Sequence, residues 1–95
     1  MTKISGYCFI SNTITQDGLK IGYMFREKPI DSDDTGWRFF SGTEDEEYLE
    51  NEDNIDEYDI RYALELDPSI EQYIHLEAEV DLERNDSDGF DIIKD

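Results

Sequence analysis

Basic residues are scarce in this sequence, whose 95 residues include 8 Lys and Arg against 26 Asp and Glu, for a formal net charge of −18. Proteins that bind nucleic acids supply cations to displace the counterions of the phosphates, and this chain has few to offer. An anionic membrane surface would repel it for the same reason. We therefore expect neither a nucleic-acid nor a membrane partner, and the natural partners of so acidic a chain are basic surfaces or cations.

Cysteine, histidine and long apolar runs are also scarce. The single Cys8 has no second cysteine for an internal disulfide, and its distance along the chain from the only histidine, His75, is unlike a zinc site. No apolar segment approaches the roughly 20 residues that span a bilayer. Residues 1–6 contain no apolar run typical of a secretory signal, so we expect a cytoplasmic protein.

Few patterns point to a metal, a cofactor or catalysis. Aligned as an EF-hand on Gly89, the sequence places Arg84 at the first calcium ligand, and aligned on Gly36 it places Gly42 where a carboxylate is needed. The chain contains no G-x-S-x-G motif and no phosphate-binding glycine loop. We predict no metal, no cofactor, no catalytic residue and no enzymatic activity. A hydrolase built on paired carboxylates stays open as an alternative, because 26 acids form pairs by chance.

The composition nevertheless predicts a folded protein. Apolar residues make up 37% of the chain and aromatic residues 13%, more than a disordered acidic tail contains. A chain of this length folds around one core and buries about 60–65% of the surface that its unfolded form exposes. We expect a single domain over residues 1–95.

The negative charge is concentrated in the second half of the chain. Residues 1–42 carry five acids and five bases, whereas residues 43–95 carry 21 acids and three bases. Residues 44–59 contain ten acids and no base, interleaved with Tyr48, Leu49, Ile55 and Tyr58. Because such crowding destabilises a compact state, we interpret the segment as a folded acidic binding surface; the alternative is a surface that serves only solubility.

Three segments of the first half have the patterns of strands. Residues 6–11 form a short apolar run, and residues 19–26 alternate apolar and polar side chains. A turn over residues 12–18 between them predicts a hairpin of these two strands. Residues 37–40 predict a third strand.

The third strand also carries residue types that are frequent in binding interfaces. We expect Trp37 and Phe39 to share the core face and Phe40 to pack on the other face beneath helices. Arg38 is expected to pair with nearby acids. Because Trp, Tyr and Arg dominate binding hot spots, Trp37, Arg38 and Tyr48 are also candidates for a partner interface.

Short helices are expected after the third strand. Thr43 and Glu46 have the spacing of a capping box, which predicts a helix over residues 44–50. Asp59 is the expected N-cap of a second helix, and Asp67 of a third that starts at Pro68.

The last part of the chain predicts two strands. Residues 76–82 alternate apolar and acidic side chains, and residues 90–93 follow after a turn, which predicts a second hairpin. The acids on the outer face of the first of these strands are Glu77, Glu79, Asp81 and Glu83. The fold class predicted is α+β, with a mainly antiparallel sheet of about five strands and two or three short helices between strands three and four.

Two strings of the sequence resemble a known family. They are K-I-G-Y-M-F-R-E-K-P at residues 20–29 and G-W-R-F-F-S-G-T-E-D-E-E-Y at residues 36–48, of which the second is the more specific. In these strings, and more loosely through the last hairpin, the chain resembles a family of small acidic bacterial proteins. The family was first described as a domain of unknown function and then assigned to the immunity proteins of polymorphic toxin systems.

The resemblance implies a non-catalytic, cytoplasmic protein that neutralises a cognate toxin by covering a basic surface or active site. The charge pattern favours the same interpretation, because a dense patch of one sign accelerates encounter and a few anchors hold the complex. We predict these partner-binding residues: Trp37, Arg38, Glu44, Asp45, Glu46, Glu47, Tyr48, Glu50, Glu52 and Asp53. The acidic face of the strand at residues 76–82 is the alternative location of the patch.

Two other classes of function remain open. One is a housekeeping interaction domain with an unrelated partner. The other is the small hydrolase, which would have a concave pocket with a carboxyl group of raised pKa.

Overall fold

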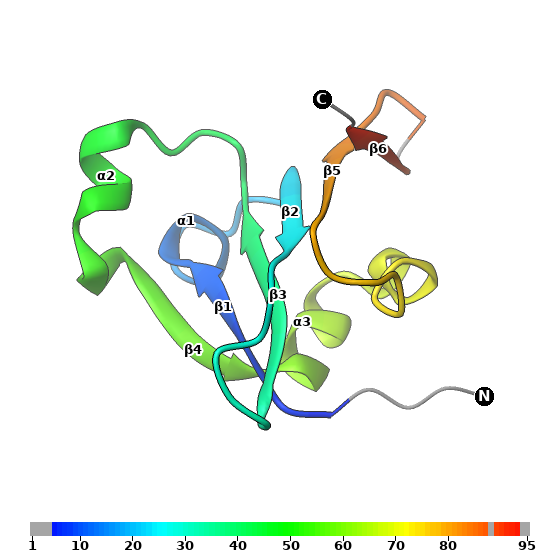
Figure 1. Ribbon diagram of the computed structural model, residues 1–95. Coiled ribbons are helices and arrows are strands. Elements are labelled where there is room, and N and C mark those ends of the chain that lie inside the picture. The colour runs from blue at the N-terminus through cyan, green and yellow to red at the C-terminus, as the bar shows by residue number, and fades with distance from the viewer. Residues whose placement is uncertain (1–4, 88, 94–95) are drawn as a thin grey trace.

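The protein is an α+β structure with a six-stranded sheet, seen in a computed structural model that describes residues 5–87 and 89–93 (Figure 1). The strands are β1 (Tyr7–Ser11), β2 (Tyr23–Arg26), β3 (Asp34–Phe40), β4 (Ile55–Asp59), β5 (Val80–Arg84) and β6 (Phe90–Ile93). Their order in the sheet is β4-β1-β3-β2-β5-β6. Only the β1–β3 pair is parallel, so the predicted class and mainly antiparallel sheet are confirmed, with one strand more than expected.

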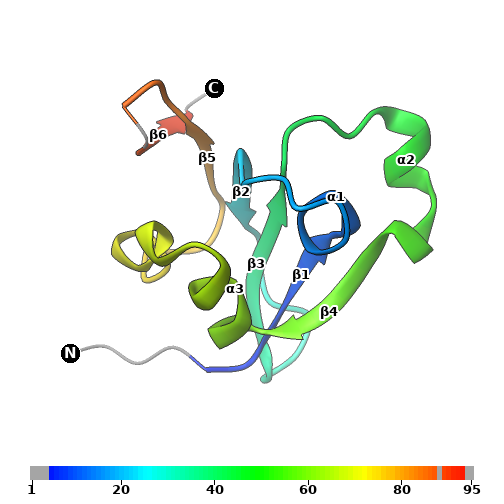
Figure 2. The same ribbon diagram turned by 180° about the vertical axis from the view of Figure 1, so that it is seen from behind.

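The helices leave one face of the sheet open. They are α1 (Asn12–Thr15), α2 (Glu46–Glu50), the 3₁₀ helix η1 (Glu52–Asn54), α3 (Ile60–Leu66) and the 3₁₀ helix η2 (Pro68–Gln72). In Figure 2, α1 and α3 lie in front of the sheet, whereas η2 (yellow) and α2 lie toward its two sides. The opposite face, turned to the viewer in Figure 1, is called the open face below.

The core lies between the sheet and the helices that cover it. Trp37 and Phe39 of β3 are fully buried there, with ring centroids 5.9 Å apart, as the sequence predicts. The Nε1–H of Trp37 donates a hydrogen bond to the carbonyl of Ile74 at 2.8 Å, which ties the segment after η2 to the sheet. The other large, fully buried apolar side chains are Ile10, Ile21, Met24, Ile60, Ile70 and Leu82.

The predicted hairpin of the first two strands is wrong. β1 lies between β3 and β4, and β2 lies between β3 and β5. The segment expected to be a tight turn contains α1, which Ser11 caps by accepting a hydrogen bond from the Thr13 backbone at 3.3 Å. α1 buries Ile14 on the helix-covered face, and the chain then continues to β2, which lies on the far side of β3 from β1.

The sequence interpretation also missed β4. Its two apolar side chains, Ile55 and Tyr58, are three positions apart, which is a helical spacing and not that of a strand. In the structure Tyr58 lies opposite Cys8 of β1. Residues 55–59 form a strand because they pair with the backbone of β1, which lies about 50 residues earlier in the chain.

The helix caps are partly as predicted. Asp59 and Asp67 cap α3 and η2, which confirms both predictions, although η2 is a short 3₁₀ helix. The capping box at Thr43 is wrong, because α2 begins at Glu46 and Asp45 is its N-cap, accepting a hydrogen bond from the Tyr48 backbone at 2.8 Å.

The second hairpin is confirmed, but its first strand is shifted. β5 begins at Val80 and not at residue 76, because Glu79 has a φ of 68° and interrupts the alternation. β6 pairs antiparallel with β5, and the turn between them includes Asp88, which lies outside the described residues. Of the four acids expected on the strand, Asp81 and Glu83 lie in β5, while Glu77 and Glu79 precede it.

Phe40 does not pack beneath helices as predicted. It points to the open face, where its ring stacks on that of Phe25 at 5.8 Å and stays half-buried.

We therefore expect unequal costs for truncating two consecutive residues of β3. Phe39→Ala should lower the free energy of unfolding by about 3–5 kcal/mol, the usual range for a buried phenylalanine. Phe40→Ala should cost less than about half of that, because its ring is not enclosed. Urea unfolding of both variants measures the difference, and equal losses would show that the two faces have been assigned wrongly.

Candidate functional site

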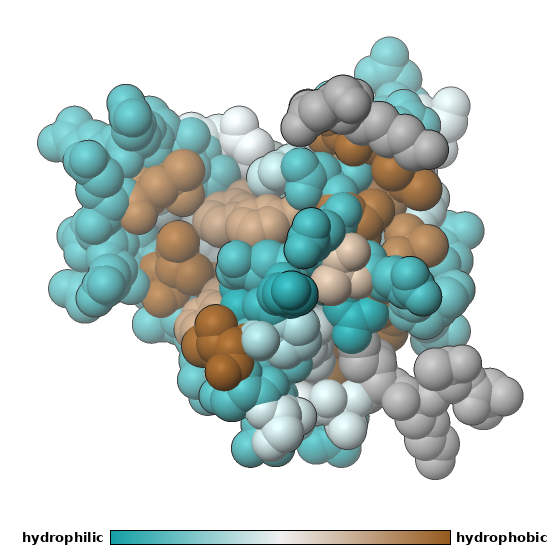
Figure 3. Space-filling view, in the orientation of Figure 1, coloured by the Kyte–Doolittle hydropathy of each residue, from teal (hydrophilic) through white to brown (hydrophobic). Residues whose placement is uncertain are grey.

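Five half-buried aromatic rings line the open face of the sheet. They come from three adjacent strands and are Tyr7, Phe9, Tyr23, Phe25 and Phe40, named here the aromatic strip. Phe25 and Phe40 stack with their planes 7° apart, and Tyr23 contacts both rings. Figure 3 shows several hydrophobic patches on this face, with hydrophilic residues between and around them.

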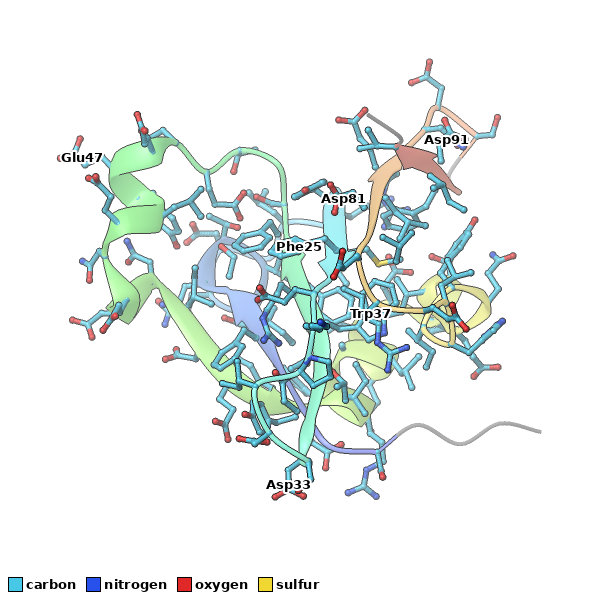
Figure 4. The ribbon with its side chains drawn as sticks, viewed as in Figure 1. Phe25, Asp33, Trp37, Glu47, Asp81 and Asp91 are labelled. Atoms are coloured by element: carbon cyan, nitrogen blue, oxygen red, sulfur yellow. The ribbon has the colours of Figure 1, made fainter. Side chains whose placement is uncertain are left out.

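Carboxylates border the aromatic strip on both sides. Cross-strand neighbours point to the same side of a sheet, and Asp81 of β5 lies opposite Phe25 while Glu57 of β4 lies opposite Phe9. Figure 4 shows Phe25 and Asp81 next to each other. By the same register, the remaining acids on these borders are Asp59, Glu83 and Asp91.

A buried ion pair supports the aromatic strip. The guanidinium of Arg38 donates to both carboxylate oxygens of Asp34 at 2.9 Å and to Glu27 at 2.7 Å, and it lies 4.6 Å from the ring centroid of Phe9. These hydrogen bonds from Arg38 lower the pKa of Asp34 to about 2, against the opposing effect of burial. The charge of Arg38 is thus neutralised inside the protein.

The other arginines in the described part of the chain are also engaged internally. Arg26 donates hydrogen bonds to three backbone carbonyls. Arg61 pairs with Asp59, and Arg84 pairs with Asp67. None of these arginines forms an ion pair with an acid of α2, η1, β5 or β6.

The structure corrects two of the predicted partner-binding residues. Trp37 is fully buried and Arg38 is only 5% exposed, so neither offers a surface to a partner. Both side chains build the fold, because β3 is a central strand whose helix-covered face is the core and whose open face is filled by the ion pair.

Glu44 also has a structural role. Its carboxylate accepts hydrogen bonds from the Thr13 hydroxyl at 2.7 Å and from the backbone N–H groups of Ser41 and Gly42 at 2.9 Å. Partial burial acts to raise its pKa, but the hydrogen bonds from Thr13 and Ser41 outweigh it and lower the pKa to about 2. Glu44 thereby joins the turn after β3 to α1.

The remaining predicted residues lie together on α2 and η1. Asp45 caps α2, and Tyr48 is half-buried. Five acids are exposed, form no ion pair with a described residue, and are named here the α2–η1 patch: Glu46, Glu47, Glu50, Glu52 and Asp53. Figure 4 shows Glu47 pointing away from the molecule. That these acids bind a partner stays a prediction.

The described residues show no arrangement typical of catalysis or metal binding. Burial raises the pKa of the Cys8 thiol to about 12, which suits a core residue and not a nucleophile. The carboxyl groups with a shifted pKa, those of Asp34, Glu44, Asp59 and Asp67, all have it lowered. Across residues 5–87 and 89–93, no three acids, histidines or cysteines converge on a possible metal position. Within the same residues no helix is both long and apolar enough to cross a bilayer.

An aromatic surface bordered by acids, above an arginine that is already paired, is typical of a protein-binding domain. Residues 8–94 match the family model of the Immunity protein Imm33 domain, and the chain therefore belongs to the Imm33 immunity-protein family. This confirms the family resemblance. Immunity-protein families are generally non-catalytic, and membership implies binding to a cognate toxin. No curated protein and no solved structure matches the chain significantly.

The buried ion pair predicts how stability depends on pH. The folded-state pKa of Asp34, about 2, lies below the unfolded value of 3.8, so its contribution is fully present above pH 4 and is lost as the pH falls toward 2. For this side chain, which is fully shielded from solvent, the contribution is about 2–3 kcal/mol. Asp34→Asn should therefore destabilise the protein at pH 7 and flatten the acid limb of the stability profile.

Asp33→Asn is the matched control, because Asp33 is the exposed neighbour of Asp34. Urea unfolding between pH 2 and pH 7 compares the three proteins. An acid limb that Asp34→Asn leaves as steep as in the wild type would contradict the assignment.

The unneutralised charge predicts a response to salt. Since the chain carries a net charge of −18, the melting temperature should rise between about 50 and 500 mM NaCl as self-repulsion is screened, and also as the pH is lowered from 7 toward 5. Circular dichroism melts measure both effects. A melting temperature that falls under both conditions is the contrary outcome.

Proposed function

We propose that this protein is an immunity protein of a polymorphic toxin system, which acts in the cytoplasm and neutralises its cognate toxin by covering a basic surface or active site. Membership of the Imm33 family supports the immunity role. The distribution of charge on this chain supports the proposal that the toxin is basic. The chain has 26 acids and 8 bases, and each of its described arginines already contacts an acid or a carbonyl of the chain itself.

The α2–η1 patch has the properties of a steering surface. Its five carboxylates are exposed on two consecutive short helices beside the sheet, and no described base neutralises them. Such a patch attracts a basic partner over about 10 Å at moderate salt and raises the rate of association more than it slows dissociation. In this proposal the toxin first contacts the five acids of the patch: Glu46, Glu47, Glu50, Glu52 and Asp53.

Capture of the partner from native cells tests the proposal. The tagged protein should recover a basic protein at about 50 mM salt, and less of it at about 500 mM salt, because screening weakens the attraction. The captured protein should then stop growth when expressed alone and become harmless when expressed with this protein. A captured protein that is not toxic would instead indicate a housekeeping partner.

Two variants of equal charge separate the patch from net charge in general. In the first, the five carboxylates of the α2–η1 patch are replaced by amides. In the second, the same is done to five exposed acids elsewhere, namely Asp17, Glu65, Glu71, Glu77 and Asp86. We expect only the first variant to lose about tenfold or more in association rate at low salt. Equal losses would leave the patch without a specific role.

A further inference from the structure

A groove of about 620 Å³ opens beside the aromatic strip, where β2, β5 and β6 adjoin. Its apolar lining includes Phe25 of β2 and Ile93 of β6, which the register places on the open face. Three acidic residues, Glu27, Glu79 and Asp81, also line it. The groove therefore combines apolar walls with negative charge in one place.

The negative charge of the groove is not neutralised by the chain itself. Glu79 and Asp81 form no ion pair with a described residue. Glu27 accepts from Arg38 through one carboxylate oxygen, yet its side chain stays 53% exposed. Arg26 also lines the groove, but its guanidinium donates to backbone carbonyls and leans over the ring of Trp37 on the helix-covered side.

The combination of apolar lining and negative charge determines which kind of chemical group can bind in the groove. An anion would be repelled by three carboxylates, and an uncharged apolar group would bury their charge without compensation, which is costly. A long cationic side chain fits both parts, because its aliphatic stem covers apolar surface while its charged end meets the carboxylates. A guanidinium fits better than an ammonium, since it is planar, stacks on an aromatic ring such as Phe25 and binds a carboxylate through two parallel hydrogen bonds.

The surroundings of the groove favour a protein as the source of that side chain. The aromatic strip continues from Phe25 across β3 to β1 and offers several half-exposed rings in a row. Aromatic residues on a sheet face without a covering helix are the apolar centre that protein interfaces require, and the acids around them form the polar rim. A free small cation would leave the strip unused.

We propose that the open face is the surface on which the toxin docks, with the aromatic strip as its apolar centre and the groove holding an arginine side chain of the toxin. This inference rests on the proposed function for the identity of the partner. The open face is separate from the α2–η1 patch, which in this proposal attracts the toxin but does not anchor it.

Tetra-arginine and tetra-lysine peptides test the chemistry of the groove without the toxin. In heteronuclear NMR titrations of the wild-type protein, tetra-arginine should shift the amide signals of β2, β5 and β6 most and bind more tightly than tetra-lysine. Shifts centred on α2 and η1, or equal binding of the two peptides, would overturn the proposal.

Two variants with the same loss of charge provide the control. Asp81→Asn should weaken binding of tetra-arginine at least threefold, whereas Glu47→Gln on α2, which lies far from Phe25 and Asp81 in Figure 4, should change it less than twofold. Phe25→Leu, which keeps an apolar wall but removes the ring, should also weaken binding of tetra-arginine and reduce its preference over tetra-lysine. Unchanged melting temperatures confirm that all three variants are folded.

Kinetics with the captured toxin then separate the two proposals. Asp81→Asn and Phe25→Leu should raise the dissociation rate, and Glu47→Gln should lower only the association rate. If the toxin is captured but dissociates from both groove variants at the wild-type rate, the groove proposal fails and the proposed function stands. If no toxin is found although tetra-arginine binds the groove as described, the proposed function fails and the groove remains a site for arginine.

Discussion

The buried ion pair between Asp34 and Arg38 is the interaction on which the rest of the structure depends. Arg38 lies in the central strand β3, and its guanidinium also reaches Glu27 after β2 and the ring of Phe9 in β1. One charged group thus connects three neighbouring strands on the open face. Removing either partner of such a pair leaves a buried charge uncompensated, at a cost of about 3–5 kcal/mol.

The backbone around the pair is shaped to fit it. The Asp34 carboxylate accepts hydrogen bonds from the N–H groups of Ile30 and Gly36 as well as from Arg38. Gly36 has a φ of +86°, and a Cβ there would come within 2.3 Å of the Glu27 carbonyl oxygen. No other residue type allows this approach without strain, which explains why the G-W-R string begins with glycine.

The use of arginine inside the fold also determines the character of the surface. The chain has few bases, and each described arginine is bound to an acid or a carbonyl of the chain itself, Arg26, Arg38 and Arg84 in partly or fully buried positions and Arg61 at the surface. Most of the remaining acids are exposed and form no ion pair with a described residue, and their mutual repulsion destabilises the isolated protein. A basic partner would relieve this repulsion on binding, so that the same charge that weakens the fold favours association.

Most of the residues that carry the family resemblance lie outside the surfaces proposed here for binding. Within residues 36–48, Trp37 and Phe39 fill the core, Arg38 forms the ion pair and Glu44 holds the following turn. Only Phe40 and the acids at the end of the string reach the surfaces proposed here for binding. The buried residues of the string therefore serve the fold, and they lie outside the binding surfaces proposed here.

The sequence alone determined the α+β class, the caps at Asp59 and Asp67, the core positions of Trp37 and Phe39 and the acidic character of the surface. Each of these depends on local spacing or on composition, which a short window of sequence contains. Tertiary structure decided that β1 pairs in parallel with β3, that residues 55–59 form a strand and that Trp37 and Arg38 are hidden from a partner. It also brought Phe25 and Asp81 together across 56 residues of chain. These outcomes depend on contacts between distant segments, whose energies no local pattern encodes.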